Sequence, residues 1–148
     1  MQIKISHLII TKNFLNMSLS KKKISFLIHS FEYGGAEKNM LLLANLFFKK
    51  GYDVTIITIN DKGDLKDYIE KGIKITNFKK SKSIFSLFNL INFFNIHSPD
   101  YHFSSIIHLN LLSIFCSLVS WKKINIISRE SNIIADTYSI KLKIKNMI

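Results

Sequence analysis

The sequence has 148 residues, which is enough for one domain and hardly enough for two. Hydrophobic residues make up 47% and charged residues 21%, a composition that excludes an intrinsically disordered chain and allows a sizeable buried core. The formal net charge is +11, but Arg129 is the single arginine, so the arginine clusters and stacking motifs typical of nucleic-acid binders are missing. Cys116 is the single cysteine, which excludes an intrachain disulfide bond.

The two ends of the chain are expected to lie outside the folded domain. Residues 1–21 have neither the long apolar core nor the small-residue cleavage site of a signal peptide, and Met17 is a candidate for the true start. We therefore expect a domain over residues 22–135, preceded by this extension and followed by a truncated tail helix over 136–148.

Between the ends, apolar segments of strand and helix character alternate. Strands are expected over 23–30, 53–60, 73–78, 103–108 and 123–128, and helices over 36–50, 64–71, 83–96 and 109–119. This alternation predicts an α/β fold, a Rossmann-like three-layer domain in which helices cover both faces of a parallel sheet through right-handed crossovers. In such sheets ligands bind beyond the carboxyl ends of the strands.

The helix expected over 36–50 has the clearest end signals. Glu37 lies in its first turn and Lys49 and Lys50 in its last, where each charge interacts favourably with the helix dipole. Gly51 is suited to terminate the helix.

Gly34 and Gly35 stand between the first strand and this helix. Glycine at this place lets a ligand approach the backbone closely and permits positive φ, and a helix start is a suitable seat for phosphate or carboxylate. A plain structural turn is an equal interpretation of the pair. Neither a dinucleotide-binding fingerprint nor a P-loop is present.

The stretch FLIHSFEYGGAEKNMLLLANLFFKKGYDVTIIT closely resembles the opening of family-four glycosyltransferases of the GT-B fold. The shared pattern is a glycine loop ending in Gly-Gly-Ala-Glu, a helix with a Leu-Ala pair, and Lys-x-Gly-x-x-Val before the next strand. These positions are Gly34, Gly35, Ala36, Glu37, Leu43, Ala44, Lys49, Gly51 and Val54. Looser matches follow at Pro99, Asp100, His108, Asn110, Leu111, Leu112 and the segment 126–132. The resemblance implies the amino-terminal half of a GT-B fold.

By this resemblance the full enzyme would transfer a sugar from a nucleotide-sugar to a glycan or lipid-linked acceptor, with retention and without a metal or other cofactor. The amino-terminal domain would hold the acceptor, and its loop over 34–37 would lie against the donor phosphates. His108 matches a family histidine near the sugar and is the candidate catalytic residue, although Ser104 and Ser105 stand where a His-x-His signature is usual.

Four further residues are candidates for the cleft, because they lie at predicted strand ends or in matched segments. They are His29, Asn110, Arg129 and Asn132. A structural role is an equal interpretation for His29, and Arg129 can instead pair with Glu130 or with solvent.

The family's donor-binding domain, with its paired glutamates and second glycine loop, has no counterpart in the sequence. We therefore expect no transfer activity from the chain alone. One alternative is a non-catalytic half that docks with a separately encoded donor-binding domain. Another is a membrane hairpin over the uncharged stretches 83–99 and 103–121.

Three lysines precede the apolar helix expected over 83–96: Lys79, Lys80 and Lys82. They suggest peripheral contact with anionic lipid, with a solvated turn as the alternative interpretation. The expected location is the cytoplasm, with this contact at the inner face of the membrane.

Overall fold

The structure is a computed structural model in which residues 21–129 are described. The predictions for Met17, Glu130, Asn132 and the tail over 136–148 lie outside the described residues.

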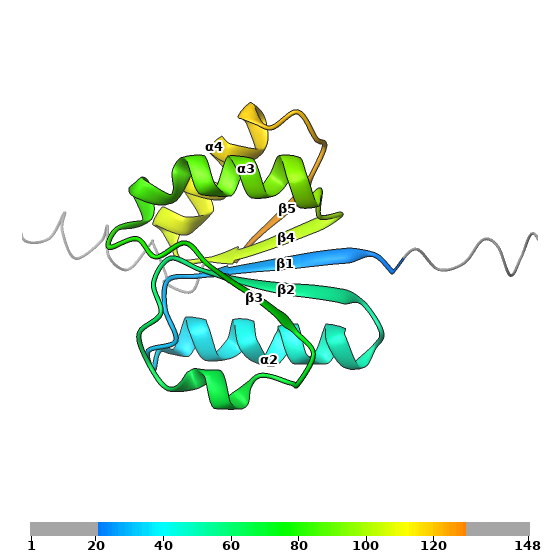
Figure 1. Cartoon of the computed structure of the whole chain (residues 1–148), viewed down its shortest axis with the longest axis vertical. Coiled ribbons are helices and arrows are strands. Elements are labelled where there is room, and N and C mark those ends of the chain that lie inside the picture. The colour runs from blue at the N-terminus through cyan, green and yellow to red at the C-terminus, as the bar shows by residue number, and fades with distance from the viewer. Residues whose placement is uncertain (1–20, 130–148) are drawn as a thin grey trace, which may run out of the picture.

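Within this range the chain forms one five-stranded parallel sheet with helices on both faces (Figure 1). The strands are β1 (Lys23–Ile28), β2 (Asp53–Thr58), β3 (Lys74–Asn77), β4 (Tyr101–Ser105) and β5 (Asn125–Arg129). The helices are α2 (Gly35–Lys49), α3 (Leu87–His97) and α4 (Ile107–Val119), with short 3-10 helices η1 (Leu65–Tyr68) and η2 (Ser83–Ser86). The strand order is β3-β2-β1-β4-β5, so the direction of strand addition reverses between β1 and β4. The expected three-layer α/β fold is confirmed.

Two cores lie on the two faces of the sheet, because successive side chains of a strand point to opposite faces. Ile24, Phe26 and Ile28 of β1 pack under α2, where Met40 and Ala44 are buried. The other face carries a second cluster under α3 and α4, made of Leu27, Ile57, Ile59, Leu90, Phe94, Leu109, Leu112 and Cys116. The burial of Cys116 agrees with its interpretation as a small core residue.

Helix α2 ends as the sequence predicts. Gly51 has φ +90°, a conformation that glycine adopts without steric cost. The Gly51 N–H donates to the Phe48 carbonyl and the Tyr52 N–H to the Phe47 carbonyl, at 2.9 and 3.2 Å. This pair of bonds is a Schellman motif, which satisfies carbonyls that the helix leaves unpaired.

Two expected elements differ from the structure. The strand predicted over 103–108 is β4, which begins at Tyr101 because it pairs in register with Ile24 and ends at Ser105, where the chain turns into α4. His108 therefore lies in the first turn of α4 and not in a strand. The helix predicted over 83–96 is divided into η2 and α3 and is buried on one side only, since Phe88 is 81% exposed.

The two uncharged stretches considered as a membrane hairpin contain the helices α3 and α4, which pack on the sheet. Among residues 21–129, no helix combines the length and the apolar character that crossing a membrane requires.

Candidate functional site

A hollow of about 330 Å³ opens at the carboxyl ends of β1 and β4. This is the point where the strand order reverses, and parallel α/β sheets bind ligands at such points. The loop after β1 and the start of α4 supply its lining: His29, Ser30, Glu32, Tyr33, Gly34, Glu37, Ile106 and His108. The structure thus brings together four of the predicted site residues, His29, Gly34, Glu37 and His108.

The two histidines face each other across the hollow. The ring centroids of His29 and His108 are 5.9 Å apart in an edge-to-face arrangement. His29 is half-buried, and its Nδ1 is buried with no hydrogen-bond partner among the described residues. Partial burial lowers the pKa of His108, the nearby His29 lowers it further, and the Glu37 carboxylate opposes both. These surroundings favour the neutral imidazole of His108, which has one N–H donor and one acceptor nitrogen.

The structure shows a steric reason for one glycine of the pair. Gly34 is extended, with φ −145°, and neither glycine adopts the positive φ that glycine permits. Instead the Glu37 carboxylate folds back over Gly34, where a Cβ atom would overlap it. Gly35 is the first residue of α2 and has open space around the position of a Cβ. A side chain at position 34 would therefore displace the Glu37 carboxylate, whereas one at position 35 would meet nothing. Ala36 follows in the first turn, half-buried.

A second loop holds the glycine loop in place. The Phe31 N–H donates to the Lys62 carbonyl at 2.7 Å, and the Leu65 N–H donates to the Phe31 carbonyl at 3.0 Å. Gly63 has φ +98° and lies directly against the Phe31 backbone. Because Phe31 is fully buried, the chain between His29 and Gly34 is anchored at its centre. Sequence patterns did not indicate this support, because Gly63 is distant from Phe31 in the chain and lies in an ordinary loop.

Ile106 directs His108 into the hollow. Ile106 has φ +80° and ψ +132°, an unfavourable conformation for a β-branched residue. Its carbonyl accepts from the N–H groups of Leu109 and Asn110 at 3.1 and 3.0 Å, so the helix begins immediately after the turn. Strained residues of this kind cluster at functional sites.

Two other predicted site residues, Asn110 and Arg129, do not line the hollow. Asn110 is buried and bridges β4 and β5: its Oδ1 accepts from the Ser104 hydroxyl at 2.8 Å, and its Nδ2 donates to the Arg129 carbonyl at 3.1 Å. The Arg129 side chain is exposed at the end of β5. Asn132 lies outside the described residues.

The hollow also contains residues that the sequence did not single out, notably Tyr33, Glu32 and Ser30. The Ser30 hydroxyl donates to the Glu32 carboxylate at 3.0 Å. Sequence reasoning could have found these three residues, because they lie next to the glycine pair in the chain. Within residues 21–129, no group of histidine, cysteine and acidic side chains is arranged to hold a metal ion.

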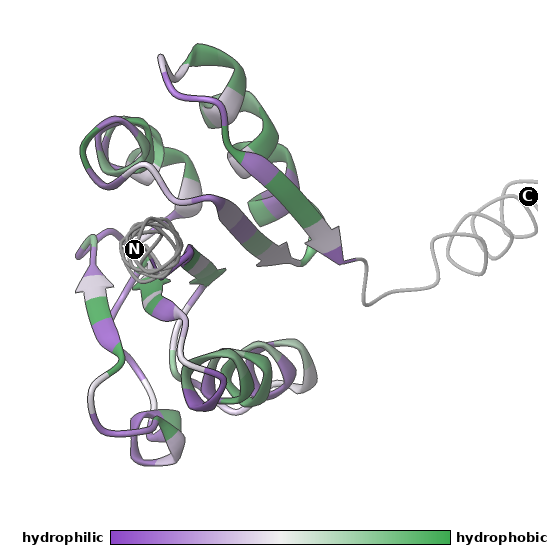
Figure 2. Ribbon diagram, turned by 90° about the vertical axis from the view of Figure 1, so that its right-hand side faces the viewer, coloured by the Kyte–Doolittle hydropathy of each residue, from purple (hydrophilic) through white to green (hydrophobic). Residues whose placement is uncertain are grey.

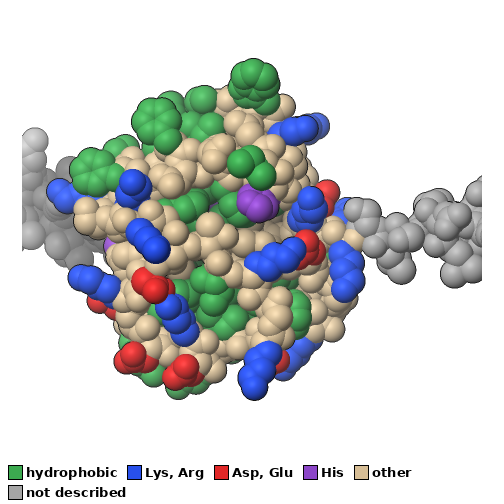
Figure 3. Space-filling view, in the orientation of Figure 1, with side chains coloured by type: hydrophobic (Ala, Val, Ile, Leu, Met, Phe, Trp, Pro, Cys, Tyr) green, Lys and Arg blue, Asp and Glu red, His purple; other side chains and the backbone are tan. Residues whose placement is uncertain are grey.

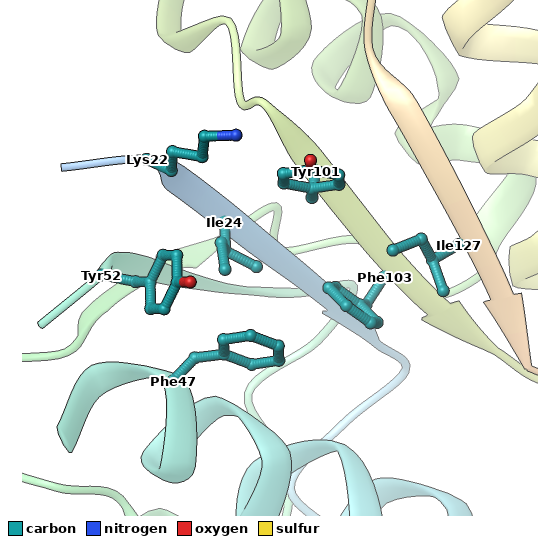
Figure 4. Close-up of a pocket in the computed structure, with 7 residues that line it drawn as sticks. All are labelled: Lys22, Ile24, Phe47, Tyr52, Tyr101, Phe103 and Ile127. Atoms are coloured by element: carbon teal, nitrogen blue, oxygen red, sulfur yellow. The ribbon is translucent and has the colours of Figure 1, made fainter. Parts of the chain in front are cut away.

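A second hollow, of about 260 Å³, lies on the α2 side of the sheet (Figure 4). Its walls are mainly aromatic, with Phe47 and Tyr52 facing Tyr101 and Phe103 across it. Lys22 is its single charged residue, and no predicted site residue lines it. The first hollow is therefore the candidate functional site.

The fold of the chain has a counterpart among solved structures. It is similar to the solved apo structure of the lipopolysaccharide outer core galactosyltransferase WaaB, with a TM-score of 0.57 and 20% sequence identity over 73% of this chain and 33% of that one. This likeness confirms, at the level of the fold, the resemblance to a GT-B glycosyltransferase.

Among curated proteins, the chain is 33% identical over 52 residues to an uncharacterized 42.6 kDa protein in the cps region of Klebsiella pneumoniae. The match covers 35% of this chain and 14% of that protein. No protein-family model matches the chain. The chain thus spans a small part of the curated relative and a third of the solved structure.

Proposed function

We propose that residues 21–129 form the acceptor-side domain of a retaining glycosyltransferase, which transfers a sugar from a nucleotide-sugar to a glycan or lipid-linked acceptor. The observation that carries the proposal is the convergence of His29, His108 and Glu37 around Gly34, at the binding edge of a sheet with a glycosyltransferase-like fold. The relative encoded in a cps region supports a polysaccharide as the product.

The chemistry of the hollow suits a ligand rich in hydroxyl groups. Neutral His108 can accept one hydroxyl proton and donate its N–H to another oxygen. The buried Nδ1 of His29 has no partner among the described residues and offers a second site for a hydrogen bond. The Glu37 carboxylate accepts hydrogen bonds only, so it favours hydroxyl groups and disfavours phosphate over Gly34.

The donor phosphates are assigned to the neighbouring Gly35. The space beside Gly35 is open, and the first N–H groups of α2 carry the partial positive charge of a helix start. In this arrangement the acceptor lies between the histidines and the phosphates approach the first turn of α2. The clamp on the leaving nucleotide would come from a complementary donor-binding half, so the chain alone is expected to lack turnover.

Binding by the isotopically labelled full chain tests this proposal. Nuclear magnetic resonance spectra are recorded during titration with UDP-galactose, GDP-mannose and lactose. We expect weak binding with shifts confined to the Gly34 and Gly35 amides and the His29 and His108 imidazoles. His108→Phe should reduce the lactose shifts, and the matched variant His97→Phe, at the exposed end of α3, should not.

Two results would contradict the proposal. One is the absence of any shift in the hollow with all three sugars. The other is a set of shifts elsewhere that His108→Phe leaves unchanged.

A further inference from the structure

Helix α4 is apolar on both of its sides. Its inner side, with Leu109, Leu112 and Cys116, packs on the sheet. Its outer side presents a second stripe at helical spacing, which is exposed: Ile107, Leu111, Ile114, Phe115 and Leu118. Figure 2 shows hydrophobic residues over most of the α4 ribbon. A helix on a water-exposed surface normally carries polar residues on its outer side, so this stripe is suited to a non-aqueous contact.

The apolar surface continues onto the neighbouring elements. Ile84 and Phe85 of η2 are exposed, Phe88 of α3 is 81% exposed, and Trp121 after α4 is 93% exposed. A groove of about 290 Å³, lined by Ile84, Leu87, Leu111, Leu112 and Phe115, joins η2 to α4. We call this surface the α3/α4 apolar face: Ile84, Phe85, Phe88, Ile107, Leu111, Ile114, Phe115, Leu118 and Trp121. Contiguous apolar surfaces of this extent mark binding sites.

Lysines flank the α3/α4 apolar face at both ends. Lys79, Lys80 and Lys82 precede η2, and Lys122 and Lys123 follow Trp121. In Figure 3 hydrophobic side chains gather over the α3 and α4 side of the molecule, with basic side chains on either side of them. Among the described residues, none of these five lysines forms an ion pair.

Basic residues far outnumber acidic ones in the segment of the chain that carries this face. Residues 71–129 contain eight basic residues and a single acidic one, Asp100. Asp100 lies just before β4, where its carboxylate accepts from the Lys23 N–H at 2.7 Å. The acidic residues of the described chain otherwise precede residue 71. The surface that would meet a partner is therefore apolar at its centre and positive around it.

We propose that the α3/α4 apolar face seats this domain on an anionic lipid bilayer. Exposed phenylalanine, leucine and tryptophan enter the boundary between head groups and acyl chains, and lysines around them are attracted to anionic head groups. The 13 residues of α4 extend about 20 Å. Since its exposed stripe runs from Ile107 to Leu118, the helix lies along the membrane surface.

This orientation places the candidate site next to the lipid. His108 lines both the site hollow and the apolar groove. If the proposed function holds, the groove takes the lipid part of a lipid-linked acceptor while its sugar reaches His29 and His108. Membrane binding itself does not depend on that function.

The single tryptophan makes the contact directly observable. Trp121 fluorescence of the full chain is recorded while vesicles of phosphatidylcholine, with or without phosphatidylglycerol, are added. With the anionic vesicles we expect a blue shift of the emission, quenching by brominated acyl chains, and co-flotation of the protein. With neutral vesicles we expect much weaker binding, and salt should weaken the anionic binding.

Matched variants separate the apolar and basic contributions. Phe88→Ser with Leu118→Ser should reduce vesicle binding at least tenfold, whereas Leu42→Ser with Leu46→Ser, two exposed leucines on α2, should leave it unchanged. Lys122→Glu with Lys123→Glu should remove the preference for anionic lipid, and Lys50→Glu with Lys71→Glu should not. All these side chains are exposed, so circular dichroism should show the same fold.

Several outcomes would overturn the proposal. One is an emission already blue-shifted without vesicles, because another part of the chain then covers the face. Another is concentration-dependent self-association through Leu118 without vesicle binding, which would make the face an interface between copies. Equal loss of binding in the α2 control variants would also refute it. Failure of sugar binding alongside intact vesicle binding would affect the proposed function only.

Discussion

Acidification is expected to destabilise this domain through His102. The imidazole is fully buried between β1 and α4, with Nδ1 2.7 Å from the Ser25 hydroxyl and Nε2 3.1 Å from the Ser113 hydroxyl. The Ser113 hydroxyl donates to the Leu109 carbonyl at 2.7 Å, so it accepts from Nε2–H and leaves Nδ1 to accept from Ser25. Neutral His102 is thus satisfied, and burial lowers its pKa to about 3.

The magnitude follows from the difference between the folded and unfolded chains. Above the ordinary pKa of 6.5 His102 is neutral in both states, and its contribution to stability is fully present. As the pH falls from 6.5 towards 3, the unfolded chain binds a proton that the folded chain does not. Each pH unit in this window costs about 1.4 kcal/mol, so a change from about pH 7 to about pH 5 costs about 2 kcal/mol.

Urea unfolding between those two pH values measures the effect. His102→Gln, which cannot titrate, should lose most of the pH dependence, and the matched variant His97→Gln, at an exposed histidine, should keep it. The imidazole resonances of His102 should not titrate in the folded chain over this range. A His102 that titrates near its ordinary pKa, or an equal slope in wild type and His102→Gln, would refute the reasoning.

Three further predictions concern the candidate site and its supports. Gly63 has positive φ and touches the backbone that follows β1, so Gly63→Ala should lower the free energy of unfolding by about 2 kcal/mol or more. Gly35→Ala, at an open position, should change it by less than about 1 kcal/mol in the same urea unfolding. Glu37→Gln removes the charge that raises the pKa of His108, so that pKa should fall in a magnetic resonance titration; a rise would contradict the arrangement of the hollow. Asn110→Ala loses two hydrogen bonds and should cost about 1–3 kcal/mol of unfolding free energy, and a neutral effect would show that Asn110 does not bridge β4 and β5.

The layers of the fold could be predicted from the sequence because its local signals agree. β-branched runs and helical stripes alternate, and Gly51 marks the end of α2. The start of α4 could not be predicted, because the apolar run after Ser105 continues without a glycine or proline. The turn depends on Ile106 adopting positive φ, which tertiary packing must impose.

Part of the candidate site could also be predicted from local sequence signals. Gly34 and Glu37 are neighbours in the chain, so the motif places them together. The place of His108 depends on where α4 begins. Because the helix begins at Ile107, Asn110 turns towards the sheet and His108 towards the hollow. Sequence periodicity also could not show that only one of the two apolar sides of α4 meets the core.

The pairing of β1 with β4 has a consequence for the order in which the nascent chain can fold. Lys23 and Asp100, which hydrogen-bond at the edge of this pair, are separated by 77 positions. The segment β1-α2-β2 leaves the ribosome well before β4, and it supplies most of the core under α2. Its other face, with Leu27, Ile57 and Ile59, stays uncovered until α3 and α4 have been synthesised. During that interval the central strand of the finished sheet is an open edge, and this is when the chain is most exposed to aggregation and to chaperones.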